Sequence, residues 1–578
     1  MKNTVIAQMF DEMADVMEIQ GENAFRVNSY RKVARVLRDL TDDVEHLHRD
    51  GRLTEVDGIG KSSAAKIAQF LDTGSIDAHR KLMAGFPASA LELLRIPNLG
   101  PKTVQRLMRE RGVESIGQLE EAIREGKLDG VAGMGAKTIE NILAGIEFLR
   151  RSSGRTLLGL ALPVARDIAD RLKEACSLES VEPAGSLRRM QETIGDIDIL
   201  AAAGTRGGKA AGRRVVGAFT SLDNVEEVLA AGDTKGSVRT DDGLQVDLRV
   251  VGEQSFGAAL CYFTGSKAHN VKIRGLALDR GLKVNEYGVF KGDRRVAGRT
   301  EEEVYGALGL PWIPPELRED RGEIEAAAAG RLPELVRLED IRGDLHAHSN
   351  FSDGALSVLD MARAARDAGY SYVAITDHSQ SLGIAGGLTP ERLRQQHAEI
   401  DAAQEELDGF AILKGTEVDI LPDGSLDYPD EVLEELDIVI ASVHVGFRMG
   451  EAQMTRRIVR AARHPCVTAI GHLTGRLLGQ REAYELDVGA VVEACAEAGT
   501  ALELNAHMQR LDITDVVCRQ TRDAGVKVLL GTDAHHDSHL WMMRLGVGTA
   551  RRGWLESTDV LNCMEADALR DYVRSTRG

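Results

Sequence analysis

The pattern that most constrains this chain is a regular series of short apolar segments in residues 341–578. They lie at 372–376, 411–415, 438–442, 467–471, 501–505 and 526–531, and stretches with helical periodicity separate them. Strands that alternate with helices in this rhythm form parallel sheets, because each helix carries the chain back to the start of the next strand. The spacing therefore predicts a parallel β/α barrel.

The rest of the chain has two other patterns, so its 578 residues are expected to form several domains. Residues 1–150 repeat apolar positions at three- and four-residue intervals, which predicts helices throughout. Residues 155–318 mix a helical stretch at 164–175 with short strands at 196–200 and 245–251, an α+β pattern. Pro311, Pro314 and Pro315, followed by a charged, alanine-rich stretch at 316–340, predict a linker before the barrel.

Composition excludes several classes of protein. The six cysteines form no Cys-x-x-Cys pair, which excludes a zinc ribbon and a disulfide framework and predicts reduced thiols. No apolar run reaches the roughly 18 residues of a membrane span, and the acidic, amphipathic start is unlike a signal peptide. We therefore expect a cytoplasmic protein with no membrane partner. The net charge of −19 does not exclude nucleic acid, because residues 341–578 carry 37 acidic against 23 basic side chains and hold most of the excess.

A short glycine motif occurs three times in the helical region. Residues 56–60, 96–100 and 131–135 share the order apolar, two residues, apolar, glycine, and an apolar residue follows seven positions later: Ile67, Leu107 and Ile142. Glycine lets a backbone approach a phosphate closely, and the helix N-terminus that follows offers free N–H groups. Ordinary glycine-capped turns are the alternative, but three copies in phase favour binding to the DNA backbone without sequence preference. The motifs resemble helix-hairpin-helix motifs, with candidate DNA contacts at Gly58, Gly60, Gly100, Lys102, Gly133, Gly135 and Lys137.

Three aspartates in the α+β region are candidate metal ligands. Asp196 and Asp198 alternate with buried apolar residues and so project from one face of a strand. Asp247 lies on the polar face of the second strand and completes a trio. Three carboxylates can hold two Mg²⁺ or Mn²⁺ ions for phosphoryl transfer. Solvated aspartates on an edge strand are the alternative, but this does not account for the Gly185-Ser-Leu-Arg-Arg189 segment just before them.

Further segments give the α+β region a specific resemblance. Tyr262-Phe-Thr-Gly-Ser266 and Val284-Asn-Glu-Tyr287 follow the aspartates, and in this order the segments resemble the nucleotidyltransferase core of family X DNA polymerases. The resemblance covers residues 1–318 and implies that Asp196, Asp198 and Asp247 are catalytic, and that Arg249 modulates closure. The implied nucleotide-binding residues are Gly185, Ser186 and Arg189 at the triphosphate, Tyr262, Phe263 and Gly265 at the sugar, and Asn270 and Arg274 at the base edge and template.

Lys66 is a separate candidate within the first hairpin. It lies where family members with 5′-deoxyribose-phosphate lyase activity keep their Schiff-base lysine. A lysine that loses its proton near neutral pH can attack an aldehyde. The alternative is a lysine that contacts phosphate or only solvent. Ser62 departs from those lyases, which commonly have another lysine there, so both roles stay open.

Histidine is concentrated in the predicted barrel, where 11 of the 15 histidines lie. Six of them and three carboxylates lie mainly at the C-terminal ends of predicted strands, where a β/α barrel places its active site. Imidazole and carboxylate ligands suit Zn²⁺, Mn²⁺ or Fe²⁺. The pattern resembles the PHP (polymerase and histidinol phosphatase) domain, a distorted β/α barrel with a trinuclear metal centre. The implied ligand sets are His346, His348, Glu417 and Asp533; Glu417, His444 and His472; and Asp353, His378 and His535.

The whole chain resembles bacterial family X DNA polymerases that carry a C-terminal PHP domain. The implied domains are an 8-kDa-type DNA-end-binding domain (1–85), fingers with two hairpins (86–150), palm (151–258), thumb (259–318), linker (319–340) and PHP domain (341–578).

The resemblance implies a monomeric, nucleoid-associated repair enzyme that fills short gaps in gapped or nicked DNA from deoxynucleoside triphosphates. The PHP domain is expected to act as a 3′–5′ exonuclease or to process 3′ ends or abasic sites. One alternative is a DNA-binding scaffold with an idle polymerase site, against which all three palm carboxylates argue. Another is a PHP domain that acts as a small-molecule phosphatase similar to histidinol phosphatase, against which the attached DNA-binding half argues.

Overall fold

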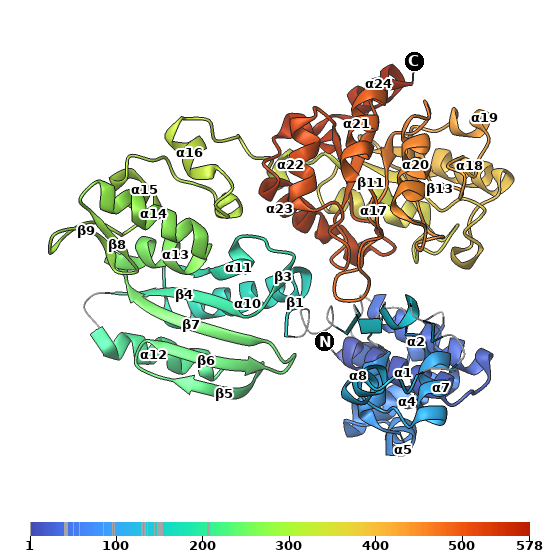
Figure 1. The fold of residues 1–578 in the computed structure, drawn as a ribbon, viewed down its shortest axis with the longest axis horizontal. Helices are drawn as coiled ribbons and strands as arrows, with labels where there is room; N and C mark the ends of the chain where they lie inside the picture. Colours follow the sequence, from blue (N-terminus) through green and yellow to red (C-terminus); the bar gives the residue numbers. More distant parts are fainter. Residues whose placement is uncertain are drawn as a thin grey trace. The chain divides into compact units, whose positions relative to one another are not determined.

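The structure is a computed structural model. It describes residues 2–39, 44–49, 51–56, 58–84, 86–94, 96, 99–128, 131, 134–135, 137–140, 142–143, 145–146, 154–204 and 208–577. The chain forms two compact units, Met1–Ser153 with Gly479–Glu482, and Gly154–Leu478 with Ala483–Gly578. Each unit is described on its own (Figure 1).

The first unit is helical, as its apolar periodicity predicts. One hydrophobic core includes Phe10, Leu37 and Ile67, and a second includes Leu107 and Leu119. The helices are α1 (Lys2–Ile19), α2 (Ala24–Asp39), α3 (Val44–Arg49), η1 (Leu53–Glu55), α4 (Lys61–Thr73), α5 (Asp77–Ala84), α6 (Ala88–Leu93), α7 (Pro101–Arg111) and α8 (Ile116–Arg124).

The three glycine motifs share one local geometry. The carbonyl oxygens of Gly60, Gly100 and Gly135 each accept hydrogen bonds, at 2.9 to 3.1 Å, from the backbone N–H groups three and four residues later. These glycines therefore begin equivalent helical segments. The predicted apolar residues Ile67, Leu107 and Ile142 are all fully buried. Gly133 lies outside the described residues.

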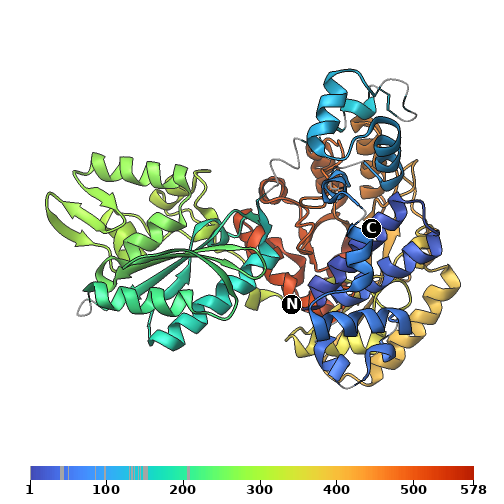
Figure 2. The same cartoon turned by 90° about the horizontal axis from the view of Figure 1, so that it is seen from below.

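A five-stranded sheet, with the order β2-β4-β7-β6-β5, lies in the segment predicted to be the palm, within the second unit. β4 and β7 are parallel neighbours, and β7 alternates buried Val246, Leu248 and Val250 with residues on the other face. The teal helices lie along the sheet in Figures 1 and 2. The elements are β1 (Thr156–Leu157), α10 (Leu158–Cys176), β2 (Val181–Pro183), α11 (Gly185–Arg188), β3 (Thr193–Ile194), β4 (Ile197–Ala203), α12 (Gly208–Thr220), β5 (Val225–Ala231), β6 (Lys235–Thr240) and β7 (Gln245–Gly252).

Helices around a three-stranded sheet, in the order β10-β9-β8, form the next part of the chain. Its elements are η2 (Glu253–Ser255), α13 (Phe256–Thr264), α14 (Lys267–Asp279), β8 (Lys283–Asn285), β9 (Gly288–Lys291), β10 (Arg294–Ala297), α15 (Glu301–Ala307), η3 (Pro315–Leu317), α16 (Glu323–Ala328) and η4 (Leu338–Asp340). The segment 319–340, expected to be a linker, packs against the region before it. Glu323 is fully buried because His269 and two backbone N–H groups bind its carboxylate, and Ile324 and Ala327 join the hydrophobic core of this region.

Seven parallel strands in sequence order, β11 to β17, form the C-terminal domain. A parallel bridge between Ala347 and Ala534 links the two ends of the sheet, so the barrel is nearly closed. The predicted barrel is thereby confirmed. The strands are β11 (Gly343–Ala347), β12 (Tyr372–Ile375), β13 (Ala411–Asp419), β14 (Ile438–Ser442), β15 (Ala469–Ile470), β16 (Ala501–Asn505) and β17 (Val528–Gly531).

Helices cover the outside of this barrel, and α24 ends the described chain (Figure 1). They are α17 (Val358–Asp367), η5 (Gly383–Ala385), α18 (Pro390–Glu405), α19 (Asp430–Leu433), α20 (Glu451–Ala462), α21 (Val488–Ala498), α22 (Asp515–Asp523), η6 (Asp537–Met542), α23 (Met543–Arg552), η7 (Ser557–Asp559), η8 (Leu561–Cys563) and α24 (Ala566–Thr576). In the described part of the chain, no helix combines the length and apolar composition that crossing a membrane requires.

Candidate active sites

Three carboxylates meet where β4 and β7 begin. Asp196 lies one residue before β4, and Asp198 on β4 is the register partner of Asp247 on β7. One oxygen of each side chain lies within 4.8 Å of the others. Burial, and then the charges of Asp196 and Asp247, raise the pKa of Asp198 to about 7. Acidic groups held this close repel one another unless a cation lies between them, so this donor set fits Mg²⁺ or Mn²⁺.

Gly185 lies directly against this cluster. Its φ is 63°, and a Cβ at this position would lie 2.5 Å from Oδ2 of Asp198. Both the backbone conformation and the lack of space therefore require glycine. The Ala184 N–H donates to the Asp198 carbonyl oxygen at 2.8 Å, which fixes the segment to β4, and half-buried Ser186 follows at the start of α11.

Arg188 holds the palm and the following region together. It forms a bidentate ion pair with Glu301 at 2.8 and 2.9 Å, and buried Arg318 binds the same carboxylate at 2.7 and 3.0 Å. Burial opposes ionisation of Glu301, but the hydrogen bonds from Arg188 and the charge of Arg318 hold the pKa of this carboxyl well below its usual range. Sequence reasoning missed this network, because nothing local marks a pair 113 residues apart.

Arg189, the predicted triphosphate contact, also forms hydrogen bonds within the protein. Its Nε donates to Glu319 at 2.9 Å, and its Nη1 donates to the Thr264 carbonyl oxygen at 2.5 Å. Its side chain is 14% exposed. Arg249, on β7, has its guanidinium 5.1 Å from the centre of the Phe263 ring.

The other predicted nucleotide contacts lie on α13 and α14 and in the turn between them. Tyr262 is exposed and packs edge-on against Phe263. Asn270 donates to the Tyr262 carbonyl oxygen at 2.8 Å, and Arg274 donates to the carbonyl oxygen of Asn270, so these side chains lie together along one pocket. Gly265, with φ 74°, lies beside the Arg189 guanidinium.

Lys66 lies on α4, in the helix that Gly60 begins. Its Nζ donates to the hydroxyl oxygen of Ser62 at 2.8 Å and to the Ser62 carbonyl oxygen at 3.1 Å. The same ammonium lies 5.5 Å from the centre of the Tyr30 ring. The residue that departs from the lyase pattern is therefore a direct partner of Lys66.

Glu417 is the centre of the barrel site. Its side chain is 1% exposed, and five of the six predicted histidine ligands have a ring nitrogen within 3.6 Å of its carboxylate. The nitrogen–oxygen distances are 2.8 Å for His378 and His472, 3.1 Å for His444, 3.4 Å for His346 and 3.6 Å for His348. Burial opposes ionisation of Glu417, but the surrounding imidazoles hold its pKa well below the usual range.

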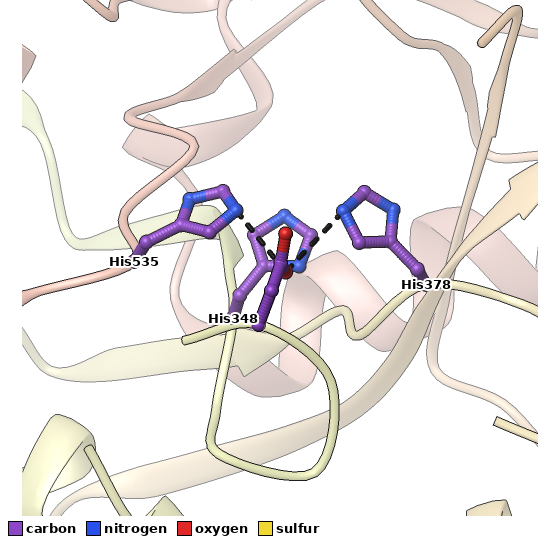
Figure 3. Close-up of side chains that lie close together, drawn as sticks. His348, His378 and His535 are labelled. Carbon is purple, nitrogen blue, oxygen red and sulfur yellow. Dashed lines mark ion pairs between the residues drawn. The ribbon is translucent and has the colours of Figure 1, made fainter. Parts of the chain in front are cut away.

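The remaining predicted ligands extend this cluster. Asp353 lies 3.5 Å from His378 and 3.3 Å from His535, and Figure 3 marks both ion pairs beside His348. Asp533 lies 3.2 Å from the Nε2 of His348 and has a left-handed backbone with φ 56°. His348 can share ligand space with Asp353, His378 and His535 as well as with His346 and Asp533, so the geometry groups it differently from the predicted sets.

Several ring nitrogens in this cluster are buried without a well-directed hydrogen bond. Among the described residues, Nε2 of His346, both ring nitrogens of His348 and Nδ1 of His378 and of His472 have no well-directed hydrogen bond, although Nε2 of His346 and of His348 and Nδ1 of His378 lie 2.8 to 3.4 Å from a carboxylate oxygen. Buried polar atoms that lack a well-directed hydrogen bond cost free energy. Nitrogen lone pairs that converge on carboxylates fit metal ions, which would satisfy both groups.

A second layer of carboxylates orients these histidines, and sequence reasoning missed it. Glu503 binds Nδ1 of His346 at 2.6 Å and accepts the backbone N–H of His472 at 2.5 Å. Asp419 binds Nδ1 of His444 at 3.0 Å. The signal was present, because Glu503 and Asp419 interrupt apolar strands with a buried charge, which needs a partner.

Comparison with known proteins accounts for this combination of sites. The families that match, with the residues matched, are helix-hairpin-helix domain (1–76), SAM-like helix-hairpin-helix tandem (90–147), DNA polymerase beta thumb (259–319) and PHP domain (344–507). The protein named DNA polymerase/3′-5′ exonuclease PolX from Bacillus subtilis (strain 168) is 40% identical over 573 residues, covering 98% of this chain and 99% of that protein.

The chain belongs to the PolX family. Other relatives match a smaller share of it. A protein named "Probable phosphatase" from Thermoanaerobacter sp. (strain X514) is 27% identical over 245 residues, which is 40% of this chain and 95% of the relative. A second protein named as a probable phosphatase, from Caldanaerobacter subterraneus subsp. tengcongensis, is 30% identical over 207 residues, which is 33% of this chain and 75% of the relative. The predicted family and the predicted multidomain fold are confirmed.

Proposed function

We propose that this enzyme is a DNA-directed DNA polymerase that fills short gaps during DNA repair, and that its barrel domain removes nucleotides from 3′ ends. The observation that carries the proposal is the presence, in one chain, of two complete and separate ligand clusters. One is the carboxylate trio of the palm and the other the nine-residue cluster of the barrel. The PolX relative over nearly the whole chain supports both activities.

In the palm, Asp196, Asp198 and Asp247 would hold two Mg²⁺ or Mn²⁺ ions. Such ions supply Lewis acidity, which stabilises the charge that develops on phosphoryl oxygens. Ser186 and the backbone after Gly185 bind the triphosphate of the incoming nucleotide, with Arg189 as a charged donor. Tyr262, Phe263 and Gly265 shape the sugar pocket. Asn270 and Arg274 contact the base edge and the template strand, and Arg249 modulates closure.

The three hairpins would hold the DNA backbone. Gly60 and Gly100 have extended backbone, and among the described residues no heavy atom lies within 4 Å of a Cβ built there. The fold itself does not require glycine at these two positions, which supports a role in admitting a phosphate. Gly58, Gly133, Gly135, Lys102 and Lys137 complete the proposed contacts. Binding should favour gapped over intact duplex and weaken with salt, and coincident binding curves for the two DNAs would contradict this assignment.

In the barrel, the nine clustered residues would hold up to three Zn²⁺, Mn²⁺ or Fe²⁺ ions. The predicted sets are His346, His348, Glu417 and Asp533; Glu417, His444 and His472; and Asp353, His378 and His535. The ions would supply the charge that attack on a phosphodiester requires. The chain's own part is to hold the imidazoles in a fixed orientation, which Glu503 and Asp419 do from the second layer.

Two substitutions in the full-length protein test the two-site proposal. Asp196→Ala removes an exposed palm ligand and should abolish nucleotide addition while 3′ digestion of single-stranded DNA persists. His346→Ala should abolish digestion while gap filling persists. Loss of both activities in folded Asp196→Ala protein would contradict the two-site proposal.

A second candidate for the barrel is a phosphomonoesterase. The relatives named as phosphatases favour it. Rates on single-stranded DNA and on a small phosphomonoester decide between them, because a nuclease should prefer the DNA by orders of magnitude. An idle polymerase on a DNA-binding scaffold is excluded if the intact protein fills a gap.

Lys66 is proposed as the residue for any 5′-deoxyribose-phosphate lyase activity. Its alternative role is a phosphate contact, and its Nζ lies 5.5 Å from the centre of the Tyr30 ring in a cation–π arrangement. Borohydride trapping on a 5′-deoxyribose-phosphate substrate distinguishes them. A covalent adduct that disappears in Lys66→Ala would establish the lyase, and no adduct would leave Lys66 as a phosphate contact.

A further inference from the structure

One helix of the barrel domain, α23, packs against the palm segment that carries Arg189 (the red helices beside the teal palm in Figure 2). A Cβ on Gly548 would lie 2.3 Å from Cε of Met190, so the helix backbone lies directly against the Met190 side chain. Met542 and Leu545 belong to the hydrophobic core of the palm. The palm and the barrel therefore share buried packing as well as a covalent connection.

At this contact, the last residue of α23 reaches the nucleotide-binding segment directly. Arg552 donates from Nη1 to the backbone carbonyl oxygen of Arg189 at 2.7 Å and to Glu319 at 2.9 Å. Its Nη2 donates to Asp515 at 2.6 Å, and its side chain is only 3% exposed. A buried guanidinium with three acceptors is fixed in orientation, and it fixes the groups that it binds.

The carboxylate of Glu319 is shared between the two domains. Oε1 accepts from Arg552 of the barrel, and also from Nε of Arg189 at 2.9 Å and from Gln191 at 2.6 Å. Two guanidinium groups on one carboxylate divide its negative charge. Without Arg552, Glu319 would be neutralised by Arg189 alone and would hold that arginine more strongly, in competition with a triphosphate.

We propose that Arg552 of the barrel domain is a positioning residue for the nucleotide-binding Arg189 of the palm. Triphosphate binding in one domain then depends on a side chain of the other. The inference rests on the proposed polymerase function and adds to it a residue outside the palm. Arg552 acts through the Arg189 carbonyl group and through Glu319.

The test is single-nucleotide gap filling by full-length Arg552→Ala, with Arg551→Ala as the matched control. Arg551 precedes it on α23 and also binds beyond its own domain, but its acceptors are Glu316, at 2.7 Å, and the Val336 carbonyl oxygen. Loss of charge-assisted hydrogen bonds should raise the KM for the incoming nucleotide about tenfold in Arg552→Ala, with a smaller change in kcat. Affinity for a non-hydrolysable nucleotide analogue should fall by the same factor.

Two results would overturn the inference: a wild-type KM and analogue affinity in Arg552→Ala, or an equal rise of KM in Arg551→Ala. Digestion of single-stranded DNA reports on the fold of the barrel. If Arg552→Ala loses digestion, Arg552→Lys carries the test, because lysine keeps the charge without the planar fork. Arg552→Lys should raise the KM for the incoming nucleotide, and an unchanged KM in this variant would also overturn the inference. An unsubstituted protein that does not fill gaps would instead contradict the proposed function.

Discussion

At the scale of the residue, each site depends on partners that come from distant parts of the chain. Glu417, on β13, is surrounded by five histidines from four other segments, and its charge is tolerated in the interior only because they surround it. The residues that orient the ligands are as buried as the ligands themselves. Substitutions in this outer layer should therefore affect metal binding selectively.

Glu503→Gln should weaken metal binding at the barrel site about 10- to 100-fold and reduce 3′ digestion in proportion. The glutamine keeps the size of the side chain, but its NH₂ group cannot accept the His472 N–H or receive the proton of His346. Metal content after dialysis, and the rate of digestion, measure the effect. Glu497→Gln, at the exposed glutamate of α21 that pairs with Arg463, is the control. Unchanged metal content in Glu503→Gln would show that Glu503 does not orient the ligands.

Gly185→Ala should slow nucleotide addition about a hundredfold, because the new Cβ displaces Asp198 from the trio by a distance comparable with 1 Å. Single-turnover gap filling measures the loss, while 3′ digestion should be unchanged. Gly217→Ala, in α12, is the matched control, since no described atom lies within 4 Å of its Cβ position. Equal rates in the two variants would mean that Gly185 does not shape the trio.

At the scale of the element, apolar periodicity predicted well which segments form helices and which form strands. It predicted poorly which of these elements contact one another. The predicted strands 438–442 and 501–505 coincide with β14 and β16, because apolar runs between turns leave little choice of register. The predicted strand 467–471 shortens to Ala469–Ile470. The segment 319–340 is predicted to be a linker because its composition is charged and alanine-rich. Its burial could not be predicted, since the partner of Glu323, His269, lies 54 residues away.

The link between α11 and α15 should make stability depend on pH. Glu301→Gln removes the charge that Arg188 and Arg318 share, and should destabilise this region by about 3 kcal/mol at pH 7. The folded-state pKa of Glu301 is depressed, so its contribution is complete above the usual carboxyl pKa of about 4.5 and declines as the pH falls below that value.

Urea unfolding followed by tryptophan fluorescence measures the free energy of unfolding at pH 7 and at pH 3.5, and one of the three tryptophans, Trp312, reports on this link because its indole N–H donates to Glu301 at 2.8 Å. The difference in the free energy of unfolding between the wild type and Glu301→Gln should be smaller at the lower pH. Glu302→Gln, one residue along the same helix and exposed, should have little effect at either pH. If this difference in free energy does not change with pH, the carboxylate charge is not what stabilises this link.

At the scale of the whole molecule, the proposed DNA-binding hairpins and the two proposed metal sites belong to different compact units. The hairpins lie in the first unit, and both ligand clusters lie in the second. Resemblance of motifs predicted the residues of both clusters, because each ligand lies in a short, distinctive motif even where the motifs are far apart in the chain. The layer between the clusters, where Arg552 meets Glu319 and Arg189, could not be predicted, since it depends on how two domains pack.

This separation predicts that metal removal acts on one unit only. Ions that bind the folded clusters and not the unfolded chain stabilise the fold by about 2.7 kcal/mol when free metal is a hundredfold above its Kd. Dialysis against EDTA should therefore lower the unfolding temperature of the second unit and leave that of the first unchanged, and added Mn²⁺ or Zn²⁺ should restore it. Differential scanning calorimetry, with hydrogen exchange to assign the transitions, measures the unfolding temperatures of both units.

His346→Ala should respond less to chelation, since the barrel has lost a ligand. If chelation removes bound metal and both transitions stay in place, the buried histidine cluster does not depend on ions for its stability, and its nitrogens without well-directed hydrogen bonds need another explanation.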